Sequence, residues 1–250
     1  MRARTPGEGE EAGMTRGHSR RIRAIVAATL TMLLVACEGS PPPSGTGAGT
    51  TPAGPGATPT ASAPACRTQT QLAAWSVTRL AEQTVVIPVD ESNVAAVTTE
   101  VADGAGGVIL FGSTAPADLG DALRQLVSHA SIAPFVMTDE EGGAVQRMAN
   151  LVGHIPSARQ MTATMSAAEI QQLAARAGRA MKANGVTMDL APVLDLDDRP
   201  GPSDANPDGT RSFSKDEKIA ETNGLAFANG LRAAGVVPVV KHFPGLGGAT

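Results

Sequence analysis

The sequence predicts an α/β fold that consists of the first five strands of a (β/α)8 TIM barrel, incomplete as given. Two observations predict it: short apolar runs alternate with helical stretches, and polar residues gather directly after several of the runs. Most runs lack polar alternation, as is typical of strands covered on both faces. They lie at residues 84–89, 107–111, 134–138, 186–194 and 236–240.

The stretches between the later runs carry helix signals. Ser166 and Glu169 have the spacing of a capping box and predict a helix to about residue 184. Ser214 and Glu217 predict a second capped helix to about residue 234 in the same way. A further helix is predicted over residues 118–130. This alternation of strands and helices indicates a parallel sheet.

A parallel sheet can be doubly wound or closed into a barrel. The first run is not followed by the G-x-G-x-x-G pattern of dinucleotide-binding folds. Asp139, Asp195 and the pair Lys241-His242 stand just after predicted strands, where a barrel builds its site. A complete barrel has eight strands in about 250 residues. We therefore expect the sequence to stop after the fifth strand of a longer protein.

Composition distinguishes two segments that precede the expected barrel domain. Residues 1–36 combine an Arg-rich stretch with an apolar run over 25–35, which is typical of a secretory signal peptide. Leu-Val-Ala-Cys at 34–37 resembles a bacterial lipobox, which implies lipidation of Cys37; an ordinary signal peptide is the alternative. Residues 37–65 are rich in Pro, Gly, Ser and Thr and predict a linker. Residues 66–250 form the expected domain, exported and lipid-anchored to the bacterial cell membrane.

Charge and cysteine content exclude several classes of function. The chain has 20 Lys and Arg against 24 Asp and Glu, so it lacks the basic excess of a nucleic-acid-binding protein. Two Cys residues allow neither a disulfide framework nor a four-Cys zinc site. The His residues have no spacing such as H-E-x-x-H. We expect no metal, no cofactor and no nucleic-acid partner.

Four motifs lie at or after the last three predicted strands. They are TDEEGGAVQR at 138–147, APVLD at 191–195, RSF at 211–213 and KHFPGLG at 241–247. In order and spacing they resemble glycoside hydrolase family 3, specifically its bacterial β-N-acetylglucosaminidases, over roughly residues 70–250. The resemblance implies hydrolysis of terminal β-linked N-acetylglucosamine, from peptidoglycan-type glycans, with retention of configuration.

The resemblance implies that five side chains hold the sugar: Asp139, Arg147, Arg211, Lys241 and His242. A carboxylate accepts hydrogen bonds from two neighbouring hydroxyls, and an Arg fork donates several without losing charge. Adjacent residues point to opposite faces of a regular strand. Lys241 and His242 can therefore meet one sugar only where the backbone departs from that geometry.

Other roles remain open for some of these acidic and basic residues. Asp139 could cap a helix or turn, and the two Arg residues could pair with the loop carboxylates Asp195, Asp197 and Asp198. We expect Glu140 and Glu141 to be solvated or structural rather than catalytic. Asp189 and Asp195 are expected to be structural carboxylates at the barrel mouth.

The catalytic groups of the family are not expected in this chain. The family nucleophile is an Asp after a later strand, and the acid/base is a His in a D-x-H loop beyond K-H-F-P-G-x-G. No residue of 1–250 matches either role, and Leu246 replaces a common His of the last motif. The alternatives are a family 3 β-glucosidase or β-xylosidase, or a non-catalytic sugar-binding surface lipoprotein.

Overall fold

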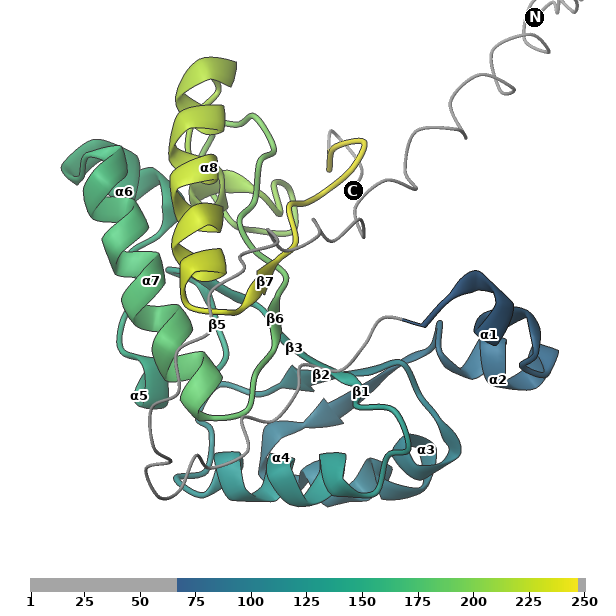
Figure 1. Ribbon diagram of the computed structural model, residues 1–250. Coiled ribbons are helices and arrows are strands. Elements are labelled where there is room, and N and C mark those ends of the chain that lie inside the picture. Colours follow the sequence, from purple (N-terminus) through teal and green to yellow (C-terminus); the bar gives the residue numbers. More distant parts are fainter. Residues whose placement is uncertain (1–66, 247–250) are drawn as a thin grey trace, which may run out of the picture. The chain divides into compact units, whose positions relative to one another are not determined.

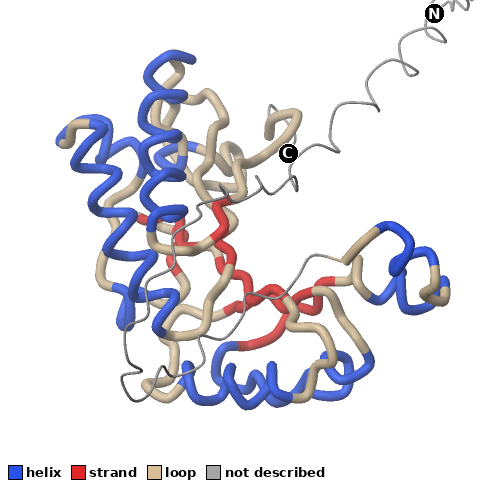
Figure 2. The backbone as a smooth tube through the Cα atoms, viewed as in Figure 1, coloured by secondary structure: helices blue, strands red, loops and turns tan. Residues whose placement is uncertain are grey.

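Five parallel strands form the sheet on which the rest of the fold is built (Figure 2). The computed structural model describes residues 67–246, which belong to one unit of the chain, Ala63–Thr250. The strands are β1 (Val86–Asp90), β2 (Gly107–Phe111), β3 (Phe135–Thr138), β6 (Met188–Asp189) and β7 (Val237–Pro238). A separate antiparallel pair, β4 (Glu140–Gly142) and β5 (Val145–Gln146), forms a small hairpin.

The strand order distinguishes the two candidate architectures. Across the sheet the order is β1-β2-β3-β6-β7, and every neighbouring pair is parallel. A doubly wound sheet reverses its order at a switch point, whereas a barrel wall adds each strand beside the preceding one. The consecutive order confirms the prediction of an α/β fold with the first five strands of a barrel. Within residues 67–246 the sheet is not closed.

The last two strands are shorter than predicted. The predicted run 186–194 contains only the two ladder residues of β6, followed by Pro192. Proline has no N–H to donate to a ladder. Pairing resumes at Val193, which bridges Lys241. This second contact keeps the segments after β6 and β7 side by side, where two of the predicted motifs lie.

Helices connect the strands. The α-helices are α1 (Gln69–Ala73), α2 (Val77–Glu82), α3 (Thr98–Asp103), α4 (Leu119–Ser128), α5 (Ala149–Val152), α6 (Ala158–Thr164), α7 (Ala167–Ala183) and α8 (Glu217–Ala233). Two 3-10 helices, η1 (Glu91–Val97) and η2 (Gly209–Arg211), lie in the connections after β1 and β6. The two long helices α7 and α8 lie side by side (Figure 1).

One of the two predicted capping boxes is confirmed. Ser166 caps α7, with its Oγ accepting from the Glu169 N–H and the Glu169 carboxylate accepting from the Ser166 N–H at 2.7 Å. The prediction for Ser214 is wrong. The N-cap of α8 is Asp216, whose carboxylate accepts from the Ile219 N–H at 3.0 Å. Asp is as good an N-cap as Ser, so the competing residue two positions later took that place.

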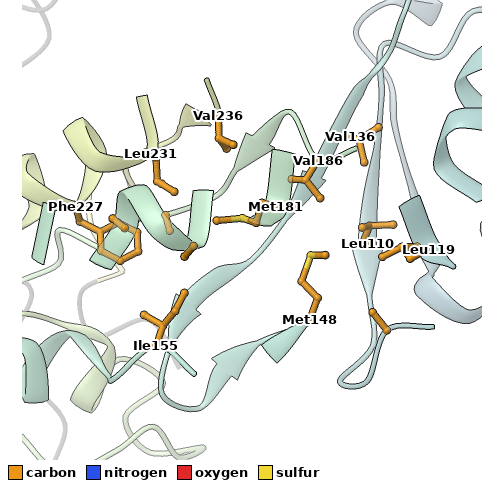
Figure 3. Close-up of a cluster of buried hydrophobic side chains, with 14 of the residues drawn as sticks. Leu110, Leu119, Val136, Met148, Ile155, Met181, Val186, Phe227, Leu231 and Val236 are labelled. Carbon is orange, nitrogen blue, oxygen red and sulfur yellow. The ribbon is translucent and has the colours of Figure 1, made fainter. Parts of the chain in front are cut away.

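The hydrophobic core lies between the sheet and the helices. In Figure 3, Met181 of α7 lies near Val186, which leads into β6, and Leu231 of α8 lies near Val236, which leads into β7. Phe227 of α8 belongs to the same cluster. All five side chains are almost completely buried. The core therefore fixes β6 and β7 from the helical side and leaves their carboxyl ends for polar residues.

The predictions for the N-terminal segments fall outside the described residues. These are the signal peptide at 1–36, the lipidation site Cys37 and the linker at 37–65. Among residues 67–246, no helix combines the length and apolar character needed to cross a bilayer.

Candidate functional site

The structure brings the five predicted residues into one cluster of charged side chains. Asp139 directly follows β3, and Lys241 and His242 follow β7. Arg211 ends η2, and Arg147 follows β5. The carboxyl ends of parallel strands meet at one edge of a sheet, so residues far apart in the sequence meet there.

Lys241 is shared by two carboxylates. Its Nζ lies 2.5 Å from Oδ1 of Asp139 and 2.6 Å from Oε1 of Glu141. The Lys241 side chain is 15% exposed and that of Glu141 only 3%, so little solvent screens these pairs. The two contacts hold the ammonium group at one position between β3 and β7.

Arg211 binds the same Glu141 carboxylate through a two-pronged contact. Its Nε and Nη2 each donate to a Glu141 oxygen at 2.8 Å, and Nη1 donates to the Pro207 carbonyl at 2.9 Å. Burial by itself would raise the pKa of Glu141, but hydrogen bonds and charge from Arg211 and Lys241 outweigh it and lower that pKa. Glu141 is therefore the common anion of the cluster.

The role of Glu141 differs from what the sequence suggested. We expected a solvated or structural residue, and it is structural but buried. We also considered Asp195, Asp197 and Asp198 as partners of Arg211, and Glu141 takes that place. A count of the charges in the motifs would have indicated a further carboxylate partner. Arg147, Arg211 and Lys241 are permanent cations, and a buried cation needs a carboxylate beside it.

His242 is oriented by Asp195. Its Nδ1 lies 2.5 Å from Oδ2 of Asp195, and its Nε2 lies 3.4 Å from Nη2 of Arg211. The second Asp195 oxygen accepts from the Leu246 N–H at 2.8 Å. The carboxylate thus fixes both the imidazole and the turn that follows it, as expected of a structural carboxylate.

The backbone between Lys241 and His242 departs from regular strand geometry. Their peptide bond is cis. Lys241 reaches Asp139 and Glu141 while His242 reaches Asp195 and Arg211. Both side chains therefore belong to one cluster, which a regular strand does not allow for adjacent residues.

Arg147 is held more loosely than the other cations. Its Nη2 lies 3.8 Å from Oδ2 of Asp139, longer than a hydrogen bond. Its guanidinium carbon lies 5.4 Å from the centroid of the Phe111 ring. Phe111 is the last residue of β2, and we did not identify it from the sequence. Its place at the same sheet edge as Asp139 is the signal that could have found it.

Two fully buried carboxyl groups support the loop that carries Asp139 and Glu141. Glu140 accepts from the backbone N–H groups of Arg147 and Met148 through Oε1, each at 2.6 Å. Asp189 accepts from the Glu140 N–H at 2.9 Å. Burial raises the pKa of Glu140 and raises that of Asp189 well above its usual value. Both are structural, as predicted, and Glu140 is not solvated.

A hollow of about 700 Å³ adjoins the cluster. Asp195, Lys241 and His242 form part of its wall, and its remaining lining includes the apolar residues Leu194 and Phe243. Within residues 67–246 no group of three or more His, Cys, Asp or Glu side chains is arranged to hold a metal ion. The arrangement offers fixed donors and acceptors beside a hollow, which suits a ligand rich in hydroxyl groups.

The loop between β6 and α8 is fixed by one buried carboxylate. Asp197 accepts from the N–H and Nε of Arg199 through Oδ1, and from Asn206 and the Gly209 N–H through Oδ2. Burial would raise the pKa of Asp197, but these hydrogen bonds lower it strongly. Gly209 begins η2 and Arg211 ends it, so this network fixes the start of the short helix that carries Arg211.

Comparison with known sequences identifies relatives of the chain. Residues 72–250 match the model of the glycosyl hydrolase family 3 N terminal domain. The Beta-hexosaminidase LpqI of Mycobacterium tuberculosis is 38% identical over 233 residues, which cover 91% of this chain and 58% of that protein. A Beta-hexosaminidase of Haemophilus influenzae is 39% identical over 119 residues, covering 46% of this chain and 32% of that protein.

Solved structures agree with these sequence matches. A glycosyl hydrolase of the GH3 family from Mycobacterium smegmatis superposes with a TM-score of 0.62 at 37% identity, covering 70% of this chain and 53% of that one. The Beta-N-acetylhexosaminidase of Beutenbergia cavernae gives 0.62 at 30% identity, with 69% and 55% covered. The chain thus spans little more than half the length of these relatives. Because the family match extends over most of its residues, the chain belongs to glycosyl hydrolase family 3, through the N-terminal domain of that family.

Proposed function

We propose that this protein hydrolyses terminal β-linked N-acetylglucosamine from peptidoglycan-type glycans with retention of configuration. The observation that carries the proposal is the convergence of Lys241, Arg211 and His242 with two carboxylates at the strand ends. The names of the relatives, beta-hexosaminidase and beta-N-acetylhexosaminidase, support the sugar class.

Each residue has a proposed role in binding. Asp139 accepts hydrogen bonds from two sugar hydroxyls, since its carboxylate has acceptor capacity beyond the bond to Lys241. Lys241 and Arg211 donate to hydroxyls from fixed positions. His242, whose Nδ1 faces Asp195, contacts a hydroxyl through Nε2, and Arg147 contacts the same glycan. No residue of 1–250 is proposed as the nucleophile or the acid/base. Pre-positioned donors lower the entropic cost of binding.

Sugar binding tests the site in this chain. We expect N-acetylglucosamine to bind, and Lys241→Met to weaken binding at least about tenfold because a charged hydrogen bond is lost. Lys218→Met, on an exposed position of α8, is the matched control. Titration calorimetry measures both, with circular dichroism to verify folding. Lack of binding by the folded wild-type chain at millimolar sugar contradicts the proposal.

Hydrolysis tests the proposed activity of the whole protein. Release of p-nitrophenol from its N-acetyl-β-glucosaminide is the expected result, with the β-anomer formed first in the proton NMR spectrum. The α-anomer formed first contradicts retention. Sugar binding without any hydrolysis favours a non-catalytic surface lipoprotein instead.

A second candidate is a family 3 β-glucosidase or β-xylosidase. A relative from Cellulomonas fimi, 32% identical over 143 residues, is named Beta-N-acetylglucosaminidase/beta-glucosidase. The proposal predicts faster hydrolysis of the N-acetylglucosaminide than of the matching glucoside and xyloside. The reverse order supports the second candidate.

We also propose export and lipid anchoring through Cys37, followed by a linker at 37–65. The Arg-rich start, the apolar run and the lipobox-like Leu-Val-Ala-Cys support this. Labelling with radioactive palmitate is expected for the wild type and for Cys66→Ser, and is expected to be lost in Cys37→Ser. Labelling that persists in Cys37→Ser contradicts the assignment.

A further inference from the structure

The Arg159 guanidinium is bound by three backbone carbonyls. Arg159 is the second residue of α6 and is partly buried. Its Nη2 donates to the carbonyls of Asp197 and Gly209, each at 2.7 Å, and its Nη1 donates to the Arg199 carbonyl at 3.0 Å. These three bonds, which we call the Arg159 clamp, join both ends of the segment 197–209 to one side chain of another element.

Gly209 is held at both of its backbone polar groups. Its carbonyl accepts from Arg159, and its N–H donates to Oδ2 of Asp197 at 3.0 Å. A Cβ on Gly209 would lie 2.2 Å from the carbonyl carbon of Gly201, so the loop is closely packed at this point. The Arg159 clamp therefore acts at the first residue of η2, the short helix that ends at Arg211.

The start of α6 is in turn tied to the loop that carries Glu141. The Gly143 N–H donates to the Ile155 carbonyl at 2.8 Å. A Cβ on Gly143 would lie 2.7 Å from Cβ of Ser157, which is the N-cap of α6, so these two segments are in close contact. The helix that carries the clamp is therefore fixed against the turn between β4 and β5.

These contacts form a closed circuit around Arg211. Arg211 donates to the Glu141 carboxylate through Nε and Nη2 at 2.8 Å, and to the Pro207 carbonyl through Nη1 at 2.9 Å. Glu141 belongs to the loop on which α6 rests, and Pro207 belongs to the segment that the Arg159 clamp holds. The position of the Arg211 guanidinium therefore depends on how these two loops are held together.

We propose that Arg159 is a positioning residue for sugar binding, which holds Arg211 where its remaining donors reach a sugar hydroxyl. Three of the five N–H donors of Arg211 are used in the bonds above, which leaves donors for the sugar. This inference rests on the proposed function, because Arg211 is a sugar-binding residue only there. The alternative is a clamp that stabilises the loop without affecting the site.

A double-mutant cycle on the affinity for N-acetylglucosamine tests the coupling. We expect Arg159→Gln to weaken binding roughly tenfold, because Arg211 is no longer held in place. In the Arg211→Met background the same change should alter the affinity by less than about twofold, since the residue through which it acts is gone. Arg176→Gln, at an exposed position of α7, is the matched control and should leave the affinity unchanged.

NMR chemical-shift titration measures these affinities into the millimolar range, with circular dichroism to verify folding. Arg159→Lys keeps the charge but replaces the forked guanidinium with a single nitrogen, so it should weaken binding as Arg159→Gln does. This milder change also keeps the test available if Arg159→Gln does not fold.

The pKa of Glu141 reports the same coupling without any sugar. Burial by itself raises this pKa, whereas the bonds and charges of Arg211 and Lys241 lower it overall. If a change at Arg159 displaces Arg211, the pKa of Glu141 should rise. A loop that is merely loosened away from the site leaves this pKa unchanged. Carbon NMR of the labelled carboxyl group follows the titration.

The outcomes separate this inference from the proposed function. If the wild type binds N-acetylglucosamine but the folded Arg159 variants keep its affinity or the Glu141 pKa, the inference is wrong and the proposed function stands. Equal losses of affinity with and without Arg211 also overturn it, as does wild-type affinity in Arg159→Lys. If the folded wild type binds no N-acetylglucosamine, the proposed function fails and the role of Arg159 in sugar binding fails with it.

Discussion

Glu141→Gln should lower the free energy of unfolding by about 3 kcal/mol at pH 7. The Glu141 side chain is 3% exposed and accepts two bonds from Arg211 at 2.8 Å and one from Lys241 at 2.6 Å. Removing one partner of a buried ion pair costs roughly 3–5 kcal/mol. Lys241 keeps Asp139 and Arg211 keeps the Pro207 carbonyl, so the lower end applies.

Urea unfolding followed by circular dichroism measures this loss. For a domain of this size it corresponds to a fall in Tm of roughly 6–12 °C. Glu100→Gln, at an exposed position of α3, is the matched control and should change stability by less than about 0.5 kcal/mol. A loss below about 1 kcal/mol in Glu141→Gln would refute the reasoning.

The pH dependence gives an independent measurement of the same pair. The pKa of Glu141 is lowered in the folded state, so its contribution is complete above the unfolded value of about 4.3. It is lost as the pH falls through the lower folded value. The stability difference between wild type and Glu141→Gln should therefore shrink on acidification toward pH 3. A constant difference contradicts the assigned ion pair.

Three further predictions follow from the buried network, the helix packing and the loop. The raised pKa of Asp189 makes the wild type lose stability as pH rises above about 4, toward the folded value. Asp189→Asn keeps an acceptor for the Glu140 N–H, so it should be at least as stable in urea at pH 8 and should depend less on pH than the wild type. Gly230→Ala places a Cβ 2.3 Å from the Gln171 carbonyl oxygen, so calorimetry should show a loss of roughly 1–3 kcal/mol despite better helix propensity. Asp197→Ala removes the anchor of the loop before α8 and should speed tryptic cleavage there at least about tenfold, by mass spectrometry.

Local patterns predicted the elements well where one signal dominated. The run 107–111 coincides with β2, and Ser166 caps α7 as its spacing indicates. The prediction failed where two local signals competed, since Asp216 rather than Ser214 caps α8. An N-cap hydrogen bond joins residues three positions apart, so the nearby sequence is enough to predict it. For the same reason, two capping residues close together in the sequence are easily mistaken for each other.

Tertiary structure decided which charges meet. The sequence by itself determined that the strands are parallel and consecutive and that Asp139, Lys241 and His242 follow strand ends. It did not determine that Glu141 is the shared anion, because Arg211 lies 70 positions away from it in the chain. Nor did it place Arg147 on Phe111. Periodicity and caps are local properties of the chain, whereas ion pairing depends on which strand ends fold together and how deeply they are buried.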